Sequence, residues 1–215
     1  MATEIEMKLS IIGGHRDEHL VMLKNGLNAL GLELDLAQGF NQSMLKNAYY
    51  DSASWQLNAL KVALRIRQKA AGDGLVYIQT LKTKGRSVNG LSQRGEWEWI
   101  LPSNKLNIAV LRENEAWPQE VDLDSLLPIF ETNFTRYAFE LSWNNSRIEL
   151  ALDQGDIISQ GKQEQINEIE LELKSGNVSD LHLLRTELQK ILTLEPSDIS
   201  KAERGYRLFN AEPTM

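Results

Sequence analysis

Apolar and charged residues alternate strictly in several short stretches of the chain, the first of which covers residues 4–9. Successive side chains of a β-strand point to opposite faces, so Glu4, Glu6 and Lys8 share one face and the apolar residues between them share the other. The pleat places the two carboxylates about 7 Å apart, with the ammonium group one step further along. Such a face could hold a divalent cation and an anion together, although an ordinary solvent-facing strand also carries charges.

The alternation recurs and predicts a protein rich in strands. The further strands are residues 62–67, 75–84, 94–99, 134–143, 147–153 and 168–173. Leucines at helical spacing predict amphipathic helices at residues 17–30 and 178–192, and we expect one short helix within residues 122–130. Residues 71–74 carry a hairpin signal, and Gly155 is expected in a turn.

The polar faces of these strands are unusual because carboxylates, Arg and Lys dominate them, where an ordinary solvated sheet is rich in Thr, Ser, Gln and Asn. An open sheet could leave the charges in water, with the helices covering its apolar face. Closing seven or eight strands into a barrel would instead aim the charges at one another, in a space for side chains or one small ligand. Enclosed charges cost about several kcal/mol each unless they are paired or bound. The residue choice favours the barrel, with an elongated polyanion held by Arg and Lys and a divalent cation held by Glu.

Composition limits the partners. The chain has 215 residues, a formal net charge of -7 and no cysteine. We expect a single domain over residues 1–215, and no overall basic field to attract nucleic acid or a membrane surface. The absence of cysteine, of a leader-like N-terminus and of a long apolar run favours a cytoplasmic protein that does not cross a membrane.

Other kinds of site find little support in the sequence. There is no Gly-x-x-x-x-Gly-Lys phosphate-binding loop. His15, His19 and His182 lack the spacing of metal ligands, and we expect surface or helix-cap roles for them. Trp97 and Trp99 are expected to pack between the barrel and its helices.

Three motifs now coincide. They are Glu4-Ile5-Glu6-Met7-Lys8, Leu64-Arg65-Ile66-Arg67 after Tyr49-Tyr50-Asp51, and Glu168-Ile169-Glu170-Leu171-Glu172 before the last long helix. With these motifs the chain resembles the CYTH family of triphosphate tunnel metalloenzymes, and within it the bacterial inorganic triphosphatases, from Glu4 to Tyr206. The resemblance implies an α+β fold, a closed antiparallel eight-stranded β-barrel with helices packed outside. The family's frequent helical CHAD domain is not expected here, so the sequence is either a stand-alone form or part of a longer protein.

The resemblance also assigns residues to roles. Catalytic roles fall to Glu4, Glu6, Lys8, Arg65, Arg67 and Lys82. Substrate-binding roles fall to Lys8, Arg65, Arg67, Lys82, Lys84 (as an alternative to Lys82), Arg94, Arg136 and Lys201. Metal ligation falls to Glu4, Glu6, Asp153, Glu170 and Glu172, with Glu96, Glu149 and Glu168 as supporting acidic residues. Glu98, Glu140, Arg147 and Glu168 are assigned less firmly, as groups that neutralise the tunnel mouth.

These residue types suit metal-dependent hydrolysis of inorganic triphosphate to diphosphate and phosphate. Guanidinium groups donate to phosphate oxygens in a fork, and hard carboxylates suit Mg²⁺ or Mn²⁺. One metal would bridge substrate oxygens, and a second could orient and acidify the attacking water. The same tunnel serves adenylate cyclases and thiamine triphosphatases of the family, and a non-catalytic triphosphate-binding or polyphosphate-binding module remains a further alternative. The carboxylates favour catalysis, since a pure polyanion binder gains nothing from them without a metal.

Overall fold

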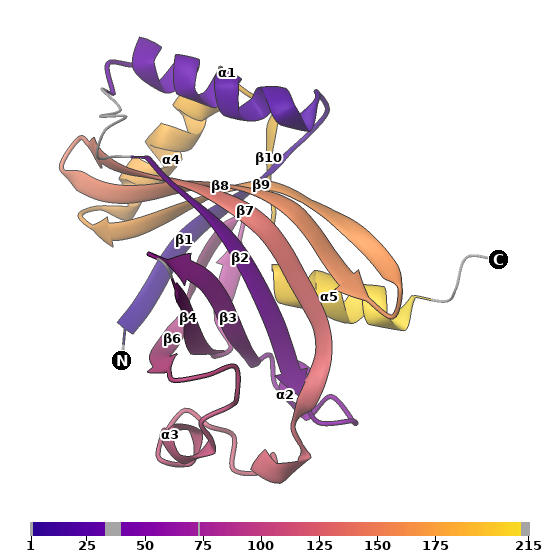
Figure 1. Cartoon of the computed structure of the whole chain (residues 1–215). Coiled ribbons are helices and arrows are strands. Elements are labelled where there is room, and N and C mark those ends of the chain that lie inside the picture. Colours follow the sequence, from indigo (N-terminus) through magenta and orange to yellow (C-terminus); the bar gives the residue numbers. More distant parts are fainter. Residues whose placement is uncertain (1, 33–39, 73, 212–215) are drawn as a thin grey trace.

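Antiparallel strands form a closed barrel in the computed structural model, which describes residues 2–32, 40–72 and 74–211 (Figure 1). The strands are β1 (Ala2–Ile11), β2 (Phe40–Asp51), β3 (Ala63–Ala71), β4 (Gly74–Lys82), β5 (Arg86–Val88), β6 (Leu91–Leu101), β7 (Leu127–Trp143), β8 (Ser146–Ser159), β9 (Lys162–Ser175) and β10 (Leu194–Pro196). Eight of them follow the order β1-β9-β8-β7-β2-β3-β4-β6, and pairing of β6 with β1 closes the ring. The short strands β10 and β5 pair antiparallel with β1 and β6, respectively. The predicted eight-stranded closed barrel is confirmed.

Helices cover the outside of this barrel and one of its ends. They are α1 (Arg16–Ala29), α2 (Gln56–Ala59), α3 (Ile108–Arg112), α4 (Val178–Leu188), α5 (Lys201–Asn210) and the single 3₁₀ turn Leu123–Ser125. Figure 1 shows α1 and α4 above the arch of β7, β8 and β9, α5 beneath that arch, and α3 at the far end. None of the helices in the described ranges combines the length and the apolar character needed to span a bilayer.

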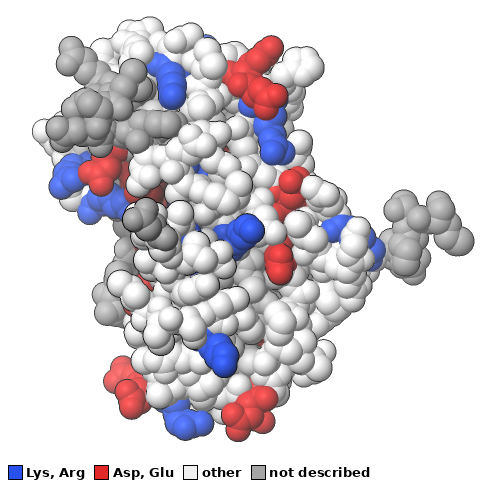
Figure 2. Space-filling model, in the orientation of Figure 1, with Lys and Arg blue, Asp and Glu red and all other residues white. Residues whose placement is uncertain are grey.

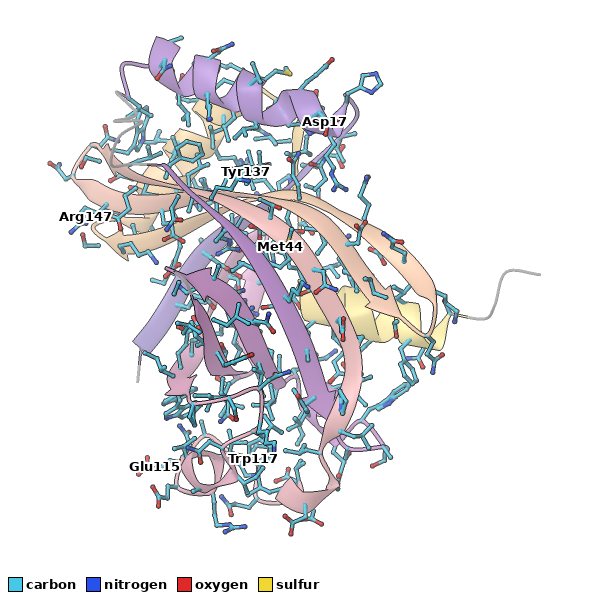
Figure 3. All side chains as sticks on the ribbon, in the orientation of Figure 1. Asp17, Met44, Glu115, Trp117, Tyr137 and Arg147 are labelled. Carbon is cyan, nitrogen blue, oxygen red and sulfur yellow. The ribbon has the colours of Figure 1, made fainter. Side chains whose placement is uncertain are left out.

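The apolar faces of the strands point outward, opposite to an ordinary water-soluble barrel. Leu150, Leu171 and their neighbours on β8 and β9 are fully buried against the leucines of α1 and α4. Figure 3 shows Tyr137 of β7 within this layer, below α1. Burying a Leu or Ile side chain contributes roughly 1.5 to 3 kcal/mol, so the helices are held to the outer wall by the alternation that turns the charged faces inward.

Two smaller apolar clusters lie apart from this layer. One packs the ring of Tyr206 on α5 against Phe130 and Phe134 of β7, and the other gathers Leu57, Leu81, Leu111 and Trp117. Trp97 and Trp99 pack against the second cluster, as predicted, and Figure 3 shows Trp117 beside α3. One cluster therefore plugs an end of the barrel with α5.

Three sequence predictions need correction. Gly155 is an interior residue of β8, where an added Cβ would lie 2.2 Å from the backbone oxygen of Asn133, and the turn is made at residues 160–161 instead. Within residues 122–130 only a single 3₁₀ turn forms, because β7 begins at Leu127. His19 is buried, with its ring nitrogens 3.1 Å from the Gly13 carbonyl oxygen and 3.3 Å from Asn167 Oδ1.

Several further elements were not assigned from the sequence patterns. The strand β2 lacks the charged alternation of the others, and α2, α3, α5, β5 and β10 lie outside the predicted ranges. The expected hairpin at residues 71–74 includes Asp73, which lies outside the described residues, but β3 and β4 do pair antiparallel on either side of it.

Candidate active site

The inward faces of the strands enclose a cavity of about 250 Å³, called the tunnel below. Its lining includes these predicted site residues: Glu4, Glu6, Lys8, Arg65, Arg67, Lys82, Arg94, Glu96, Arg136, Glu149, Glu170, Glu172 and Lys201. Glu98 lines it as well. Elsewhere, on the outer face shown in Figure 2, acidic and basic side chains are interspersed.

Strand register explains how residues distant in sequence meet in the tunnel. Glu6 on β1 lies opposite Glu172 on β9, which lies opposite Glu149 on β8. These three carboxylates, called the acidic row, are cross-strand neighbours, and like charges directly opposite each other destabilise a sheet. Burial and the charges of Glu149 and Glu4 raise the pKa of Glu172, despite an opposing contribution from Lys174 2.7 Å away. The row is thus short of positive charge.

Cations also hold carboxylates of β1, including Glu6 of the acidic row. Arg94 donates to Glu4 Oε2 at 2.9 Å and to Glu6 Oε1 at 2.7 Å, and the Lys82 ammonium lies 2.7 Å from Glu4 Oε1. Burial alone would raise the pKa of Glu4, but the charges of Lys82 and Arg94 outweigh it and hold that pKa below its ordinary value. Glu4 is therefore ionised and already fixed in position before any ligand binds.

Arg136 and Lys201 form a second ion-pair group at the α5 end. Both oxygens of Asp153 accept from Arg136 at 2.7 Å, and the Lys201 ammonium lies 2.7 Å from Asp153 Oδ2 and 2.9 Å from Glu170 Oε1. Lys201 also contacts Glu168. Oxygens of Asp153, Glu168 and Glu170 lie within 4.8 Å of one another, as in a metal site, but the Lys201 ammonium contacts all three carboxylates. The Lys201 ammonium is therefore the cation of this triad in the folded chain.

Three predicted residues therefore lie in unexpected places. Asp153 is fully buried on the inward face of β8, covered by Arg136 and Lys201, for which it is a counter-ion; the metal ligation expected for it stays a prediction. Glu168 is 2% exposed and bound by Lys201 and Arg204, far from the mouth position expected for it. Lys84 follows β4, is exposed and does not line the tunnel.

The wall formed by Arg65 and Arg67 of β3, called the basic wall below, lacks close carboxylates. Arg67 Nε donates to Asn47 Oδ1 at 2.8 Å, and no carboxylate of the described residues lies within 4.0 Å of its guanidinium. Burial, and then repulsion by Arg65 and Arg136, lower the pKa of Arg67 to about 9. Arg65 reaches Glu96 only at 3.9 Å, and its buried Nε has no partner among the described residues. Such guanidinium groups favour an anionic ligand.

Helix α5 is positioned so that Lys201 enters the tunnel. Ser200 caps the helix, with its side chain accepting from the Glu203 amide while Glu203 accepts from the Ser200 amide. The Tyr206 hydroxyl donates to buried Asp51 at 2.7 Å, and Gly205 leaves room for the Phe130 ring, since an added Cβ would lie 2.1 Å from it. Close packing at Gly205 and the hydrogen bond at Asp51 therefore fix the first residue of the helix.

The donor chemistry of the acidic row suits a divalent cation. Its ligands would be the carboxylate oxygens of Glu6, Glu149 and Glu172, with Glu4 beside them, and oxygen donors are those that Mg²⁺ and Mn²⁺ prefer. Among the described residues only the Asp153 triad has its oxygens within 4.8 Å of one another, so the side chains of the row would have to close around an ion. Burial is the first cause of the raised pKa of Glu172, and the charges of Glu149 and Glu4 add to it. A metal here would remove that repulsion.

A sequence model of the CYTH domain matches residues 2–206. The chain belongs to the CYTH domain family. Over 169 residues it is 40% identical to an inorganic triphosphatase of Haemophilus influenzae, a match that covers 76% of this chain and 46% of that protein. The chain thus spans about half the length of this curated relative.

Solved structures share the CYTH fold at low identity. A putative adenylyl cyclase of Hippeastrum, described as having a dominant triphosphatase activity, aligns with a TM-score of 0.67 at 20% identity, covering 95% of each chain. A protein of Pyrococcus horikoshii aligns with a TM-score of 0.59 at 17% identity, covering 95% of this chain and 98% of that one. At these identities the likeness concerns the fold alone.

Tyr49 and Lys174 line the tunnel of this CYTH domain without having been singled out in the sequence. Arg65 and Tyr49 line the same part of the tunnel, and the charge of the guanidinium acts on the Tyr49 hydroxyl. Burial raises the pKa of Tyr49, but the charge and hydrogen bond of Arg65 outweigh it, so that pKa is lowered. Extending the alternation of β9 by one step beyond Glu172 would have found Lys174. No comparable pattern predicted a tunnel position for Tyr49, because a tyrosine in a strand is typical of the apolar core.

Proposed function

We propose that this CYTH domain hydrolyses inorganic triphosphate to diphosphate and phosphate with the help of Mg²⁺ or Mn²⁺. The observation that carries the proposal is the separation of charge inside the tunnel. In the basic wall, Arg67 has no carboxylate within 4.0 Å among the described residues, and the buried Nε of Arg65 has no partner there. The acidic row sets three neighbouring carboxylates against two cations, Arg94 at Glu6 and Lys174 at Glu172 and Glu149. An anion and a metal ion together complete both sets, and neither alone does.

The basic side chains would bind and orient the substrate. Arg65, Arg67 and Arg136 present forked donors, and the ammonium groups of Lys8, Lys82 and Lys201 act as point charges along the same cavity. Their carboxylate partners hold several of these cations in place, so little reorganisation is needed when the triphosphate binds. The Tyr49 hydroxyl would donate to a phosphoryl oxygen beside Arg65.

The acidic row would hold the metal beside the terminal phosphoryl group. A bound Mg²⁺ or Mn²⁺ supplies charge neutralisation and lowers the pKa of a coordinated water. Phosphoryl transfer requires mainly positioning and charge stabilisation from the protein. Water attacks the terminal phosphorus in line with the bridging oxygen, the P–O bond to that oxygen breaks, and the diphosphate leaves as an anion held by the basic wall.

The 40% identity to an inorganic triphosphatase supports this choice of substrate. The test is phosphate release from inorganic triphosphate, ATP and thiamine triphosphate, each with Mg²⁺, Mn²⁺ or a chelator. We expect metal-dependent turnover of inorganic triphosphate that is lost in Glu6→Ala and kept in Glu195→Ala, which removes an exposed carboxylate of β10 outside the tunnel.

Other outcomes point to the alternatives. Preferential cyclisation of ATP would identify a nucleotide cyclase, and preferential release from thiamine triphosphate would identify a thiamine triphosphatase. Tight binding of triphosphate without turnover under any metal would overturn the proposal and indicate a triphosphate-binding module.

A further inference from the structure

A second cavity of about 330 Å³ adjoins the tunnel at the α5 end. Its lining shares Glu6, Lys8, Lys82 and Arg94 with the tunnel, so the two cavities adjoin across these side chains. The second cavity, called the second mouth below, lies between the segment after β4 and the segment that leads into α5. A ligand held by Lys8, Lys82 and Arg94 in the tunnel would therefore lie next to the second mouth.

The second mouth is lined with more basic than acidic side chains. The basic ones are Lys8, Lys61, Lys82, Lys84, Arg86 and Arg94, and the acidic ones are Glu6, Asp198 and Glu203. The tunnel differs, since carboxylates and cations are nearly balanced in its lining, which also includes Glu98, Glu149, Glu172 and Lys174. The second mouth is thus the more basic of the two adjoining cavities.

The acidic residues of the second mouth are already occupied. Asp198 accepts from the Ser87 hydroxyl at 2.7 Å and from the backbone amides of Gly90 at 2.8 Å and Asn89 at 3.2 Å. Glu203 completes the cap of α5 and lies 4.0 Å from the Lys61 ammonium. Through these hydrogen bonds, Asp198 connects the β5–β6 turn to the segment that precedes α5, and it fixes the rim of the second mouth.

Lys84 and Arg86, in contrast, have no carboxylate within 4.0 Å among residues 2–32, 40–72 and 74–211. Their position is fixed by the backbone: Thr83 donates its amide to the Gly95 carbonyl at 3.0 Å, and Gly85 passes so close to β6 that a Cβ would lie 2.3 Å from the Gln93 carbonyl oxygen. Two exposed cations are thus held at the rim of a cavity that opens onto Lys82 and Arg94.

We propose that the second mouth is a subsite for one further phosphoryl group, bound by Lys84 and Arg86. The inference rests on the proposed function, because it takes the tunnel itself to hold a triphosphate. Ser87 and Ser200 also line this cavity, but their hydroxyls already donate to Asp198 and Glu203, so Lys84 and Arg86 are the donors that the proposal uses. The group is either the fourth phosphoryl of a longer linear phosphate or a separate orthophosphate ion beside bound triphosphate.

The test measures binding by calorimetry in chelator, where no turnover occurs, for the wild type and for Lys84→Gln/Arg86→Gln. The matched control, Lys105→Gln/Arg112→Gln, removes the same charges from exposed positions around α3 that line neither cavity. In the first arm, tetraphosphate is compared with triphosphate. We expect tetraphosphate to bind the wild type about tenfold more tightly, as one or two charge-assisted contacts allow, and this ratio to fall toward one only in the Lys84/Arg86 variant.

In the second arm, orthophosphate is titrated into protein saturated with triphosphate. Binding that is lost in the Lys84/Arg86 variant and kept in the control identifies a separate ion as the occupant. If tetraphosphate gains nothing over triphosphate and no orthophosphate binds, or if the variant and the control behave alike, the subsite is overturned. Phosphate release from triphosphate is measured on the same preparations, so loss of the proposed function is seen independently of these two ratios.

Discussion

The two walls of the tunnel differ in how their charges are satisfied. On β1 and β9, Glu4 and Glu170 are each held by cations within 3.0 Å, and their pKa values are lowered, in both cases because nearby Lys and Arg charges outweigh burial. On β3, Arg67 has only an amide oxygen as a close partner. Glu4 and Glu170 therefore have their counter-ions within the folded chain, whereas Arg67 has no carboxylate within 4.0 Å among the described residues.

This difference separates stability from function among chemically similar residues. A buried ion pair that loses one partner leaves an uncompensated charge, whereas a buried charge without a partner already lowers stability. Cations that are paired with buried carboxylates should therefore contribute to folding stability, and the cations of the basic wall should contribute to ligand binding. The predictions below test this distinction from the largest effect to the smallest.

Arg136→Gln should lower the free energy of unfolding, whereas Arg67→Gln should not. Removing Arg136 leaves fully buried Asp153 with Lys201 as its remaining cation, and we expect a loss of about 3 to 5 kcal/mol of unfolding free energy. Arg67→Gln should leave stability unchanged or higher and weaken triphosphate binding by about 2 to 5 kcal/mol. Denaturant unfolding and calorimetric binding measure the two quantities. Arg147→Gln, which breaks the exposed pair with Glu140, is the control and should cost less than about 1 kcal/mol. Equal destabilisation by the Arg136 and Arg67 variants would contradict the distinction.

Glu172→Gln should weaken divalent-cation binding. It removes a central carboxylate of the acidic row, and we expect a loss of about 10-fold to 100-fold in Mn²⁺ affinity, while triphosphate binding in chelator changes little. Titration of Mn²⁺ followed by its paramagnetic resonance signal checks the first value. Glu195→Gln on β10 provides a control for the charge change. An unchanged Mn²⁺ affinity would remove the acidic row as the metal site.

Much of this arrangement could be predicted from sequence because a two-residue period determines which side chains share a face. The alternation placed Glu4, Glu6, Arg65 and Arg67 together, and residue choice favoured a closed barrel before any coordinates were considered. Register could not be predicted in the same way. Whether Glu172 meets Glu6 or a neighbour depends on how β1 and β9 slide along each other, and that is set by packing of the outer leucines and by the turns.

The period also says nothing of depth along a strand. Asp153 and Glu149 lie on the same face of β8, but Asp153 is 0% exposed behind Arg136 and Lys201, while Glu149 lines the tunnel. The difference arises from α5, which plugs one end of the barrel through contacts of Tyr206 and Gly205. The position of α5, which comes late in the chain, therefore determines which acidic residues of β8 act as counter-ions.

Tyr49→Phe tests whether the basic wall includes a neutral donor. The change removes a hydroxyl that lines the tunnel beside Arg65. Loss of a hydrogen bond from that hydroxyl to a charged ligand would cost about 1.5 to 3 kcal/mol. We expect the variant to have a lower kcat than the wild type and a smaller change in the KM for triphosphate. A clearly higher KM would show that the hydroxyl also contributes to ground-state binding. Tyr50→Phe is the matched control, because Tyr50 lies on the opposite face of β2 and packs outside the tunnel. Equal kinetics of the Tyr49 variant and the wild type would show that this hydroxyl has no part in the reaction.

Lys174→Gln should have the smallest effect and the opposite sign to Glu172→Gln. The Lys174 ammonium lies 2.7 Å from Glu172 and 3.8 Å from Glu149, so it occupies part of the space that a metal would share with the acidic row. A partly exposed ion pair contributes about 0.2 to 1 kcal/mol, and its removal should tighten Mn²⁺ binding by roughly twofold to fivefold. Lys190→Gln breaks an equally short pair with Glu187, outside the tunnel, and should leave Mn²⁺ affinity unchanged. Weaker Mn²⁺ binding after loss of Lys174 would mean that the lysine positions the carboxylates for the metal, and that its charge does not compete with the ion.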